Sequence, residues 1–569
     1  MKRILILGAN IDQVSLIKAA KTEGYYTIVC DYADDHPGVP LADKHYAVNY
    51  MDAEAVLSVA RHEKIDGVIG NSDPAMPIVA HVAEELGLVG NPQESVDIFA
   101  SKNAFREFQE RIGLYCPKYV KSNDYSEIEK AIGSFRYPII VKPDLSGGSK
   151  GATTIYENQP ERLKEVFEVC KDLSRDGKVT VEEYVKMPSL DAIEGDLFVL
   201  GDEIIWDGLF TNPRSVMAPM LPMAKIFPAI ISDEELAIIK RNVTKMFKEA
   251  GVRHGEYNIE MYFTSEGELF IIENNPRQGG NRIPQLLKQH TGIDYDRLLI
   301  TTAVGDNTYF DSVKNVYLNH NYLSQHIVFS NYNGLLETVE FKSDILPYIT
   351  ATEFIRKNGD RINQRNNSAD CIAYVTLKFP DRETQLTHMG RIEELIYPIV
   401  KDREVPIAHC CLPCQLVYDF MTGDGYDFFV PKLERVPRTV DGYAEQLATF
   451  CTIAYDIDEK YQIKGMVAGY TQNLKRPGYA LIAEVYVNRE FRREGLGEKL
   501  MLRFINHCES IGLDGAWLHV YENNYQAQKL YRKLGFSIDE PYCNGNVLAM
   551  SLTFQEKNVL GMSEDIEAY

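Results

Sequence analysis

Two carboxylates and an amide stand on neighbouring apolar segments near residue 270. Glu260 lies on the first segment, and a turn at Ser265–Glu268 separates it from the second. Glu273 and Asn275 follow the second apolar run, Leu269–Ile272. In an antiparallel hairpin the two carboxylates would lie side by side. Hard oxygen ligands suit Mg²⁺, which binds nucleotide phosphates. The hairpin fits a metal site, and it fits a solvent-facing hairpin with acidic ends equally well.

A glycine-rich loop offers groups that would bind the phosphates of such a nucleotide. In the stretch YPIIVKPDLSGGSKGA, a predicted strand runs into a loop whose backbone amides can close on phosphate oxygens. The glycines of this loop are Gly147, Gly148 and Gly151. Lys142 at the strand end and Lys102 near the start of a charged helix are placed to neutralise phosphate charge. Many surface loops share this composition, so the loop indicates a phosphate site only in combination with the acidic hairpin.

The first hundred residues contain alternating strands and helices. The apolar and helical runs are Lys2–Leu7, Asp12–Gly24, Tyr26–Asp31, Gly67–Gly70 and Pro77–Leu86. Alternation at these lengths predicts a parallel sheet with helices on both faces. The stretch GANIDQ lacks a full G-x-G-x-x-G pattern, which argues against a dinucleotide site.

The rest of the chain divides by pattern into further units. Residues 101–305 have an α+β pattern, which includes a predicted helix over Asp233–Ala250. Residues 306–403 contain mixed strands and a predicted helix, MGRIEELIYPIV, without a catalytic cluster. Residues 404–555 return to an α/β pattern, and residues 556–569 form an acidic tail. The predicted fold class is therefore a multidomain protein of α/β and α+β units.

Length and charge limit the possible partners. The chain has 569 residues, and at roughly 100–200 residues per domain we expect three to five units. A net charge of −22 argues against nucleic acid and anionic membrane as partners. We find neither a signal peptide nor an apolar run of about 18 residues, which predicts a cytoplasmic protein.

One cysteine motif stands apart from the scattered thiols. HCCLPC contains His409, Cys410, Cys411 and Cys414. A structural zinc site usually takes four ligands in two separated pairs. We therefore interpret the motif as buried, reduced thiols, with a metal site as the alternative.

The order of the N-terminal motifs resembles the ATP-grasp superfamily over roughly residues 1–400. The resemblance is to carboxylate–amine ligases of the L-amino-acid ligase type, with carbamoyl-phosphate synthase and biotin carboxylase as more distant relatives. It implies a pre-ATP-grasp α/β domain over residues 1–100, ATP-binding lobes over 101–305 and a C-terminal lobe over 306–403. The implied cofactors are ATP and Mg²⁺ or Mn²⁺.

The resemblance implies a role for each matching residue. The implied phosphate ligands are Lys102, Lys142, Gly147, Gly148 and Gly151. The implied adenine hinge, whose backbone reads the base edge, is Glu182, Tyr184 and Val185. The implied metal ligands are Glu260, Glu273 and Asn275. The family usually places a ribose-binding glutamate shortly after the hinge, whereas the stretch KMPSLDAIEG offers Asp191.

The resemblance also implies a reaction. ATP would phosphorylate a carboxylate, and an amine would then displace phosphate from the acyl phosphate. Arg277 matches the arginine of the N-P-R motif, which is implied to hold the acyl phosphate. Gly279 and Gly280 permit close approach of a substrate. Arg282 would pair with a substrate carboxylate or form a salt bridge with a neighbouring acid.

A second chemistry is predicted near the C-terminus. An apolar strand, Ala480–Val487, leads through RREGLG into a helix. A glycine turn at a helix N-terminus presents free N–H groups that suit pyrophosphate, although ordinary strand–helix turns share this form. Downstream, LHVYENNYQAQKLYRKLGF reads as a strand, an asparagine turn and an amphipathic helix.

These two segments together resemble the GNAT superfamily of acyl-CoA N-acyltransferases over about residues 415–555. The residues that match the acyl-CoA signature are Arg492, Gly495 and Gly497. Those that match the second signature are Asn524, Ala527, Tyr531, Gly535 and Phe536. Tyr531 is the implied general acid toward the departing thiolate, and acetyl-CoA is the implied cofactor. Glu484 is the nearest strand carboxylate and is either the general base or a structural or substrate-binding group.

The sequence therefore predicts a bifunctional enzyme that takes small-molecule carboxylate and amine substrates, with a homodimer as a possible assembly. One alternative is an ATP-grasp enzyme with another acceptor, such as bicarbonate. A second is a ligase regulated by a non-catalytic acyl-CoA-binding module. A pseudoenzyme would require broken metal ligands, and the sequence keeps all three.

Overall fold

The computed structural model describes most of the chain. The described residues are 1–144, 151–155, 158, 160–185, 187, 189, 191–215, 221–280, 282–315, 321–365, 367–404, the backbone of 407–409, 416–417, 420–421, 423, 425, 428, 443, 447, 451–458, 462–471, 476–543 and 545–554. Within these ranges, no helix has the length and apolar character needed to cross a membrane.

The chain forms two compact units. The first unit comprises residues 1–213, 224–325 and 377–386, and the second comprises residues 214–223, 326–376 and 387–569. The predicted domain boundaries are finer than this division and stay predictions.

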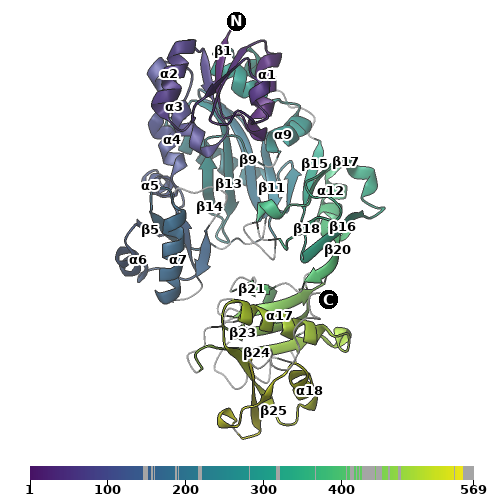
Figure 1. Cartoon of the computed structure of the whole chain (residues 1–569). Helices are drawn as coiled ribbons and strands as arrows, with labels where there is room; N and C mark the ends of the chain where they lie inside the picture. Colours follow the sequence, from purple (N-terminus) through teal and green to yellow (C-terminus); the bar gives the residue numbers. More distant parts are fainter. Residues whose placement is uncertain are drawn as a thin grey trace. The chain divides into compact units, whose positions relative to one another are not determined.

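The first unit begins with a parallel sheet, as predicted, and the sheet has four strands in the order β3-β2-β1-β4. Its strands are β1 (Arg3–Leu7), β2 (Tyr26–Asp31), β3 (Lys44–Ala47) and β4 (Gly67–Ile69). Its helices are α1 (Val14–Thr22), α2 (Ala53–Glu63) and α3 (Met76–Leu86). Ile4 and Ile6 pack in one core with α1, and Leu5 and Leu7 pack in another with α2 and α3. Alternate side chains of β1 thus enter opposite layers, and Figure 1 shows the helices on both faces.

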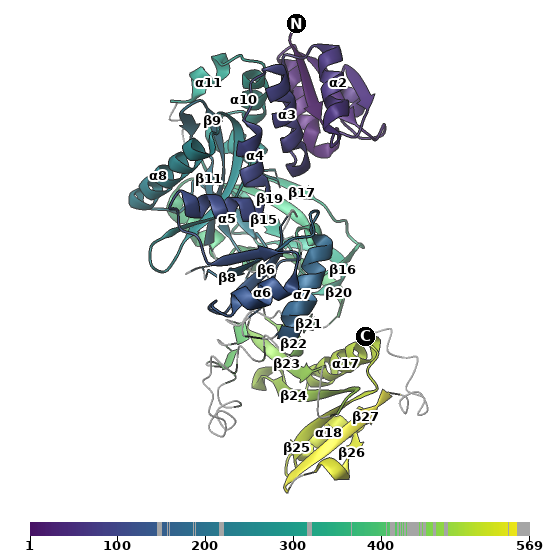
Figure 2. The same ribbon diagram turned by 90° about the vertical axis from the view of Figure 1, so that its left-hand side faces the viewer.

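A smaller antiparallel sheet, in the order β5-β8-β6-β7, follows a helical connection. Its strands are β5 (Tyr119–Ser122), β6 (Ile139–Pro143), β7 (Thr153–Ile155) and β8 (Val179–Glu183). The helices of this region are α4 (Gln93–Ala100), α5 (Lys102–Arg111), α6 (Tyr125–Ile132) and α7 (Pro160–Leu173). Ile128 of α6 and Phe167 of α7 share a core with Val141 and Val181, so both helices cover one face of the sheet (Figure 2).

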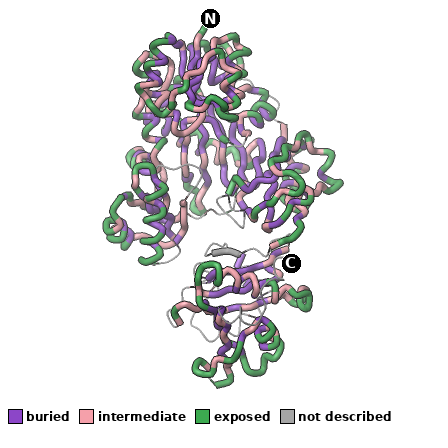
Figure 3. The backbone as a smooth tube through the Cα atoms, viewed as in Figure 1, coloured by how far each residue is buried: buried purple, intermediate pink, exposed green. Residues whose placement is uncertain are grey.

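The main sheet of the first unit contains the strand order β14-β13-β9-β11-β12-β15, with β10 beside β9. Its strands are β9 (Asp191–Leu200), β10 (Glu203–Ile205), β11 (Leu209–Pro213), β12 (Ala224–Phe227), β13 (His254–Phe263), β14 (Leu269–Asn275) and β15 (Tyr322–Val328). The helices around it are α8 (Asp233–Ala250), α9 (Ile283–Thr291), α10 (Tyr295–Ala303) and α11 (Thr308–Val313). The predicted helix over Asp233–Ala250 is confirmed as α8, which packs Val243 and Phe247 against Ile259 and Met261. Figure 3 shows the middle of these strands as buried.

One predicted helix is wrong. In MGRIEELIYPIV, Met389 ends helix α12 (Arg382–Met389), α13 (Ile392–Leu395) forms one short helix, and Ile396–Glu404 forms strand β20. Pro398 interrupts helical hydrogen bonding, and the β-branched residues around it favour a pleated strand. The other elements of this region are β16 (Asn333–Phe341), β17 (Ile349–Phe354), β18 (Arg361–Ile362) and β19 (Ala373–Phe379). Strand β16 pairs with β18 and β20.

The C-terminal sheet of the second unit has the strand order β21-β22-β23-β24-β25-β27-β26. Its strands are β21 (Ile407–His409), β22 (Thr452–Ile457), β23 (Ile463–Tyr470), β24 (Tyr479–Val487), β25 (Gly515–Tyr521), β26 (Ser537–Ile538) and β27 (Val547–Thr553). Its helices include α17 (Leu496–Ser510) and α18 (Tyr525–Lys533). Strands β24 and β25 are parallel neighbours. Phe504 and Met501 of α17 pack with Val467 and Ala480 of the sheet, so α17 covers one face.

Candidate active sites

The predicted acidic hairpin is present in the first unit. Glu260 of β13 and Glu273 of β14 are direct cross-strand partners, and Asn258 pairs with Asn275. Strand β14 continues through Asn275, three residues beyond the apolar run that predicted it. Asn275 Nδ2 donates to Glu273 Oε1 at 3.3 Å. Directly paired residues point to the same face of a sheet, so the two carboxylates lie together and repel unless a cation is near.

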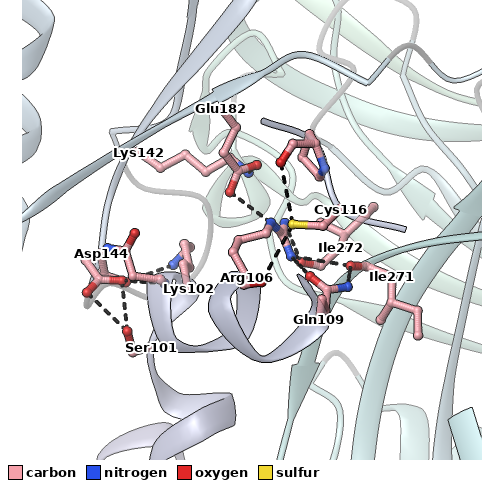
Figure 4. Close-up of polar contacts among 12 residues, drawn as sticks. Ser101, Lys102, Arg106, Gln109, Cys116, Lys142, Asp144, Glu182, Ile271 and Ile272 are labelled. Atoms are coloured by element: carbon pink, nitrogen blue, oxygen red, sulfur yellow. Dashed lines mark hydrogen bonds and ion pairs between the residues drawn. The ribbon is translucent and has the colours of Figure 1, made fainter. Parts of the chain in front are cut away.

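Lys102 lies at the first turn of α5, and its Nζ donates to the main-chain carbonyl of Asp144 at 3.5 Å. Ser101 Oγ caps the helix by accepting from Ala104 N and donates to both Asp144 carboxylate oxygens at 3.1 Å (Figure 4). Asp144 Oδ1 also accepts from Asn103 N at 3.0 Å. Burial lowers the pKa of Lys102, and Lys142 acts in the same direction while Glu273 opposes it. A buried ammonium of this kind favours a nearby anion.

Glu182 of β8 is held by two cations. It is only 1% exposed. Arg106 Nε donates to its Oε1 at 3.1 Å, and Lys142 Nζ donates to its Oε2 at 2.9 Å (Figure 4). Burial alone would raise the pKa of Glu182, but the two cations lower it to about 2. Arg106 also donates to the carbonyl of Ile272 at 2.9 Å, so it joins α5, β8 and β14. Sequence reasoning missed Arg106.

The predicted hinge follows β8. Glu182 itself lies within the ladder between β5 and β6, and its side chain orients Lys142. The main-chain groups that remain to bind the adenine base are therefore those of Tyr184 and Val185. Both line a cavity of about 520 Å³. The hydroxyl of Tyr262 donates to the Val185 carbonyl, which fixes the path of the chain at this point. Asp191, the predicted ribose ligand, is exposed at the start of β9.

Arg277 is held by a residue of the parallel sheet region. Its Nε donates to Asp73 Oδ1 at 2.7 Å and its Nη2 donates to Asp73 Oδ2 at 3.2 Å. Burial would lower the pKa of Arg277, but Asp73 outweighs it and raises the pKa. Asp73 follows β4, and nothing in its local sequence predicted this pairing. Arg282 precedes α9 with a left-handed backbone, φ 67°.

The loop after Arg277 is fixed by buried polar groups. Gly279 N donates to Asp196 Oδ2 at 2.8 Å, and Asn258 Nδ2 donates to Asp196 Oδ1 at 2.8 Å. Burial raises the pKa of Asp196 to about 6. The pKa of the neighbouring Glu256 is also raised, by burial and by Asp196. Asp196 thus sets the position of the glycine that sequence reasoning assigned to substrate approach.

The glycine turn of the second unit begins α17. Gly495 has φ 81° and immediately precedes the first helical residue, Leu496. A Cβ on Gly497 would come within 3.3 Å of Val487, so a side chain there would press on β24. Arg492 Nε donates to the Val487 carbonyl at 2.8 Å and thereby closes the turn. The N–H groups of the first helical turn are thus available to an anionic ligand.

Glu484 and Tyr531 are both buried near this turn. Tyr443 donates to Glu484 Oε1 at 2.5 Å, and sequence reasoning missed Tyr443. Burial and then Glu484 raise the pKa of Tyr531 to about 12, so its hydroxyl is protonated at neutral pH. Asn524 accepts from Ala527 N at 3.2 Å and caps α18. Its side chain therefore already serves the helix.

Some predicted residues lie outside the described ranges. These are Gly147, Gly148 and the HCCLPC motif, apart from the backbone of His409. Gly151 is described and has φ 79°. Among the residues with described side chains, no three or more His, Cys, Asp or Glu residues form a group arranged for a metal. The candidate site at Glu260 and Glu273 has two carboxylates and an amide, so a nucleotide would complete its ligands.

Comparison with known families matches both regions. The family described as "D-ala D-ala ligase C-terminus" matches residues 112–302, and the "Acetyltransferase (GNAT) family" matches residues 420–536. The first range contains Lys142, the acidic hairpin and Arg277. The second contains Glu484 and Tyr531.

Similar proteins include the carbamoyl phosphate synthase large chain of Thermotoga neapolitana, which is 27% identical over 324 residues. That match covers 53% of this chain and 28% of the relative, so the chain spans less than a third of the relative's length. The solved L-amino acid ligase from Bacillus licheniformis has a TM-score of 0.58 at 18% identity, covering 71% of this chain and 99% of that one. The biotin carboxylase domain dimer of Hydrogenobacter thermophilus 2-oxoglutarate carboxylase has a TM-score of 0.52 at 19% identity, covering 77% and 98%.

These findings define the class of protein. The chain has the ATP-grasp fold and carries a C-terminal GNAT domain, as its sequence motifs predicted. Each region matches the model of an enzyme family, a ligase family in the first and an acetyltransferase family in the second.

Proposed function

We propose that the chain is an ATP-dependent carboxylate–amine ligase fused to an acetyl-CoA-dependent N-acetyltransferase. The observation that supports the ligase most is the direct pairing of Glu260 with Glu273 beside the partly buried Lys102. Paired carboxylates favour a bound cation, whereas a buried ammonium favours a bound anion. Mg²⁺ and the phosphates of ATP together satisfy both.

The proposed roles follow from the positions of the side chains. Glu260, Glu273 and Asn275 would hold Mg²⁺, which neutralises charge on the phosphates during transfer. Lys102 and Lys142 would bind phosphate oxygens, because Lys102 Nζ is held by the Asp144 main-chain carbonyl and Lys142 Nζ by the Glu182 carboxylate. The solved biotin carboxylase domain carries MgADP, which supports this pair of cofactors.

Arg277 would stabilise an acyl phosphate. Its guanidinium is held in one orientation by Asp73 and by the Gln278 carbonyl, and a fixed cation stabilises developing charge without reorganisation. The Gly279–Gly280 backbone would allow the substrate carboxylate to approach, with Arg282 as its partner. An amino acid is the proposed carboxylate, and this rests on the similarity to the L-amino acid ligase.

The proposed acetyl transfer uses the second unit. The helix N-terminus after Gly495 would bind the pyrophosphate of acetyl-CoA, with Arg492 beside it. Tyr531, which is protonated at neutral pH, would donate to the departing thiolate. Glu484 would accept a proton from the acceptor amine, directly or through water.

A release assay tests the ligase. ADP and phosphate release would be screened over pairs of amino acids and small acids, with mass spectrometry of the products. We expect Glu273→Gln to abolish release and Glu266→Gln, an exposed change in the turn of the same hairpin, to preserve it. Release by Glu273→Gln at the wild-type rate would refute the metal assignment.

A second acceptor is supported by one neighbour. The solved biotin carboxylase domain holds bicarbonate. If bicarbonate is the acceptor here, ADP release will require bicarbonate, and its rate will not depend on which amine is supplied. The same neighbour is a dimer, and we propose a homodimer for this chain, to be checked by analytical ultracentrifugation.

A further inference from the structure

A cavity of about 110 Å³ lies within the second unit. Its lining comes from β15, the segment before β16, α13, β20 and the β22–β23 region. Among the described residues that line it, none is assigned to either proposed active site.

Buried polar atoms of this lining that lack hydrogen-bond partners include His326 Nδ1 and Asn331 Oδ1. The His326 side chain is only 1% exposed. Burial lowers its pKa to about 4, so the imidazole is neutral at pH 7, with one donor and one acceptor nitrogen. Buried polar atoms are almost always satisfied, which points to a polar occupant of the cavity.

The partly buried Lys464 and the exposed Arg403 also line the cavity, and neither has a carboxylate partner among the residues that the structure describes. Lys464 Nζ lies 5.4 Å from the centre of the Phe491 ring, and the Arg403 guanidinium lies 4.7 Å from the centre of the Tyr332 ring. Neither forms an ion pair with a residue that the structure describes. Ring contacts leave the full positive charge in place, so these side chains favour an anionic group.

The lining also contains a buried arginine that is paired with a carboxylate, and a further carboxylate. Arg365 Nη2 donates to Glu393 Oε1 at 2.6 Å, so this buried guanidinium already has a carboxylate. Asp458 adds a second carboxylate to the lining and accepts from Gln462 N at 2.8 Å. The cavity therefore presents cations and oxygen acceptors together.

We propose that this cavity binds a small zwitterionic amino acid. Its carboxylate would pair with Lys464 and Arg403, and the three hydrogens of its ammonium would be donated to His326 Nδ1, Asn331 Oδ1 and Asp458. A simple anion would leave Asn331 Oδ1 unsatisfied, and a simple cation would leave both basic side chains unpaired. A volume of about 110 Å³ gives room for a molecule of amino-acid size.

The position of the cavity gives this binding a consequence. Tyr332, which lines it, donates through its hydroxyl to Asp456 Oδ1 and to the Ile457 carbonyl, both at 2.8 Å. Gln364 Nε2 donates to the Tyr455 hydroxyl at 2.7 Å. An occupant would thus contact both the segment before β16 and the strands of the GNAT domain. The inference that it links amino-acid supply to acetyl transfer rests on the proposed function, whereas the binding does not.

Calorimetry with the full-length chain tests the proposal. Each proteinogenic L-amino acid would be titrated into a chain that carries Glu273→Ala, so that ligation does not interfere. Acetate and methylamine would be separate probes for the two charges. We expect one group of amino acids to bind, and Lys464→Met to weaken that binding roughly 10- to 100-fold. Lys357→Met, an exposed lysine of the same unit outside the cavity, should leave it unchanged.

Hydrogen exchange separates this site from the ligase site. Binding should protect peptides that contain Tyr332 and Lys464, and Asn331→Leu should remove this protection while acetyl-CoA binding is retained. Acetate binding as tightly as the best amino acid would overturn the zwitterion assignment. Amino-acid binding that survives Lys464→Met, or no protection at millimolar concentration, would overturn the site. A failure to observe ADP release would contradict the proposed ligase activity but not amino-acid binding in this cavity.

Discussion

Glu182 shows how single charges are arranged around the proposed nucleotide site. Its carboxylate receives one hydrogen bond from Arg106 and one from Lys142. Arg106 is 2% exposed and also donates to the Ile272 carbonyl. Because it is buried, water cannot replace the Glu182 carboxylate as its partner. Lys142 stands at the edge of this group, which leaves its ammonium available to a phosphate. The buried pair therefore acts as a support for the lysine.

Removal of Arg106 should destabilise the first unit strongly. In Arg106→Met, Glu182 keeps its charge but loses its buried partner, and breaking such pairs costs about 3–5 kcal/mol. The free energy of unfolding would be measured by urea titration. Arg111→Met, an exposed change on the same helix, is the control and should stay within about 0.5 kcal/mol of wild type. A loss for Arg106→Met no larger than that of the control would contradict the structural role of the pair.

The same carboxylate predicts a pH dependence. The pKa of Glu182 is about 2 in the folded chain and about 4.3 for an unfolded glutamate. A lowered carboxyl pKa stabilises the fold above the unfolded value, and this stability is lost as pH falls through the folded value. Between about pH 4.3 and about pH 2, the wild type should therefore lose more stability than Glu182→Gln. If the unfolding free energies of the wild type and of Glu182→Gln changed equally with pH, the charged pair would not stabilise the fold.

At the scale of elements, patterns along the chain predicted most of the framework. The strand Tyr26–Asp31 and the helix Asp233–Ala250 have the predicted bounds, because apolar periodicity and clear caps mark them. The end of β14 was missed. Glu273 and Asn275 are polar, yet pairing with Glu260 and Asn258 keeps them in the strand. Long-range pairing overrides local preference in such positions.

Contacts between distant elements account for the site residues that the sequence did not predict. Asp73 and Arg277 are 204 positions apart, and Arg106 meets Glu182 from a different layer. No local spacing encodes these pairs, whereas Glu260 and Glu273 belong to one hairpin whose turn fixes their register. The sequence thus predicted the pairing of the two carboxylates better than the groups that orient the cations.

The loop between β14 and α9 permits a matched test. A Cβ on Gly279 would lie 2.6 Å from Ile283 Cδ1 and 2.7 Å from Asp196 Oδ1, whereas a Cβ on Gly280 would meet no atom within 4 Å. Gly279→Ala should therefore cost about 1–3 kcal/mol, as overpacked positions do. Gly280→Ala should stay within about 0.5 kcal/mol. Urea titration of both variants checks this, and equal losses would show that Asp196 does not fix the loop.

At the scale of the whole molecule, the two sets of catalytic candidates belong to different compact units. Lys102, Lys142, Glu260, Glu273 and Arg277 all lie in the first unit, whereas Glu484 and Tyr531 lie in the second. The first set suits ATP, and the second suits an acyl-CoA thioester. A covalent connection raises the local concentration of one site near the other, to roughly millimolar for short flexible linkers. This arrangement benefits the cell when both sites serve one pathway.

Separate sites should lose activity separately. Glu273→Ala should stop ADP release, because the metal contributes several kcal/mol of charge stabilisation, and should leave acetyl-CoA consumption intact when an acceptor is supplied. Tyr531→Phe should slow acetyl transfer by about 10²-fold, as loss of a general acid does, and should spare ligation. Both rates would be measured on each variant with the ligase product added directly. If Glu273→Ala also abolished acetyl transfer under these conditions, the acetyltransferase would depend on an intact ligase site, and the two activities would have to be treated as one coupled system.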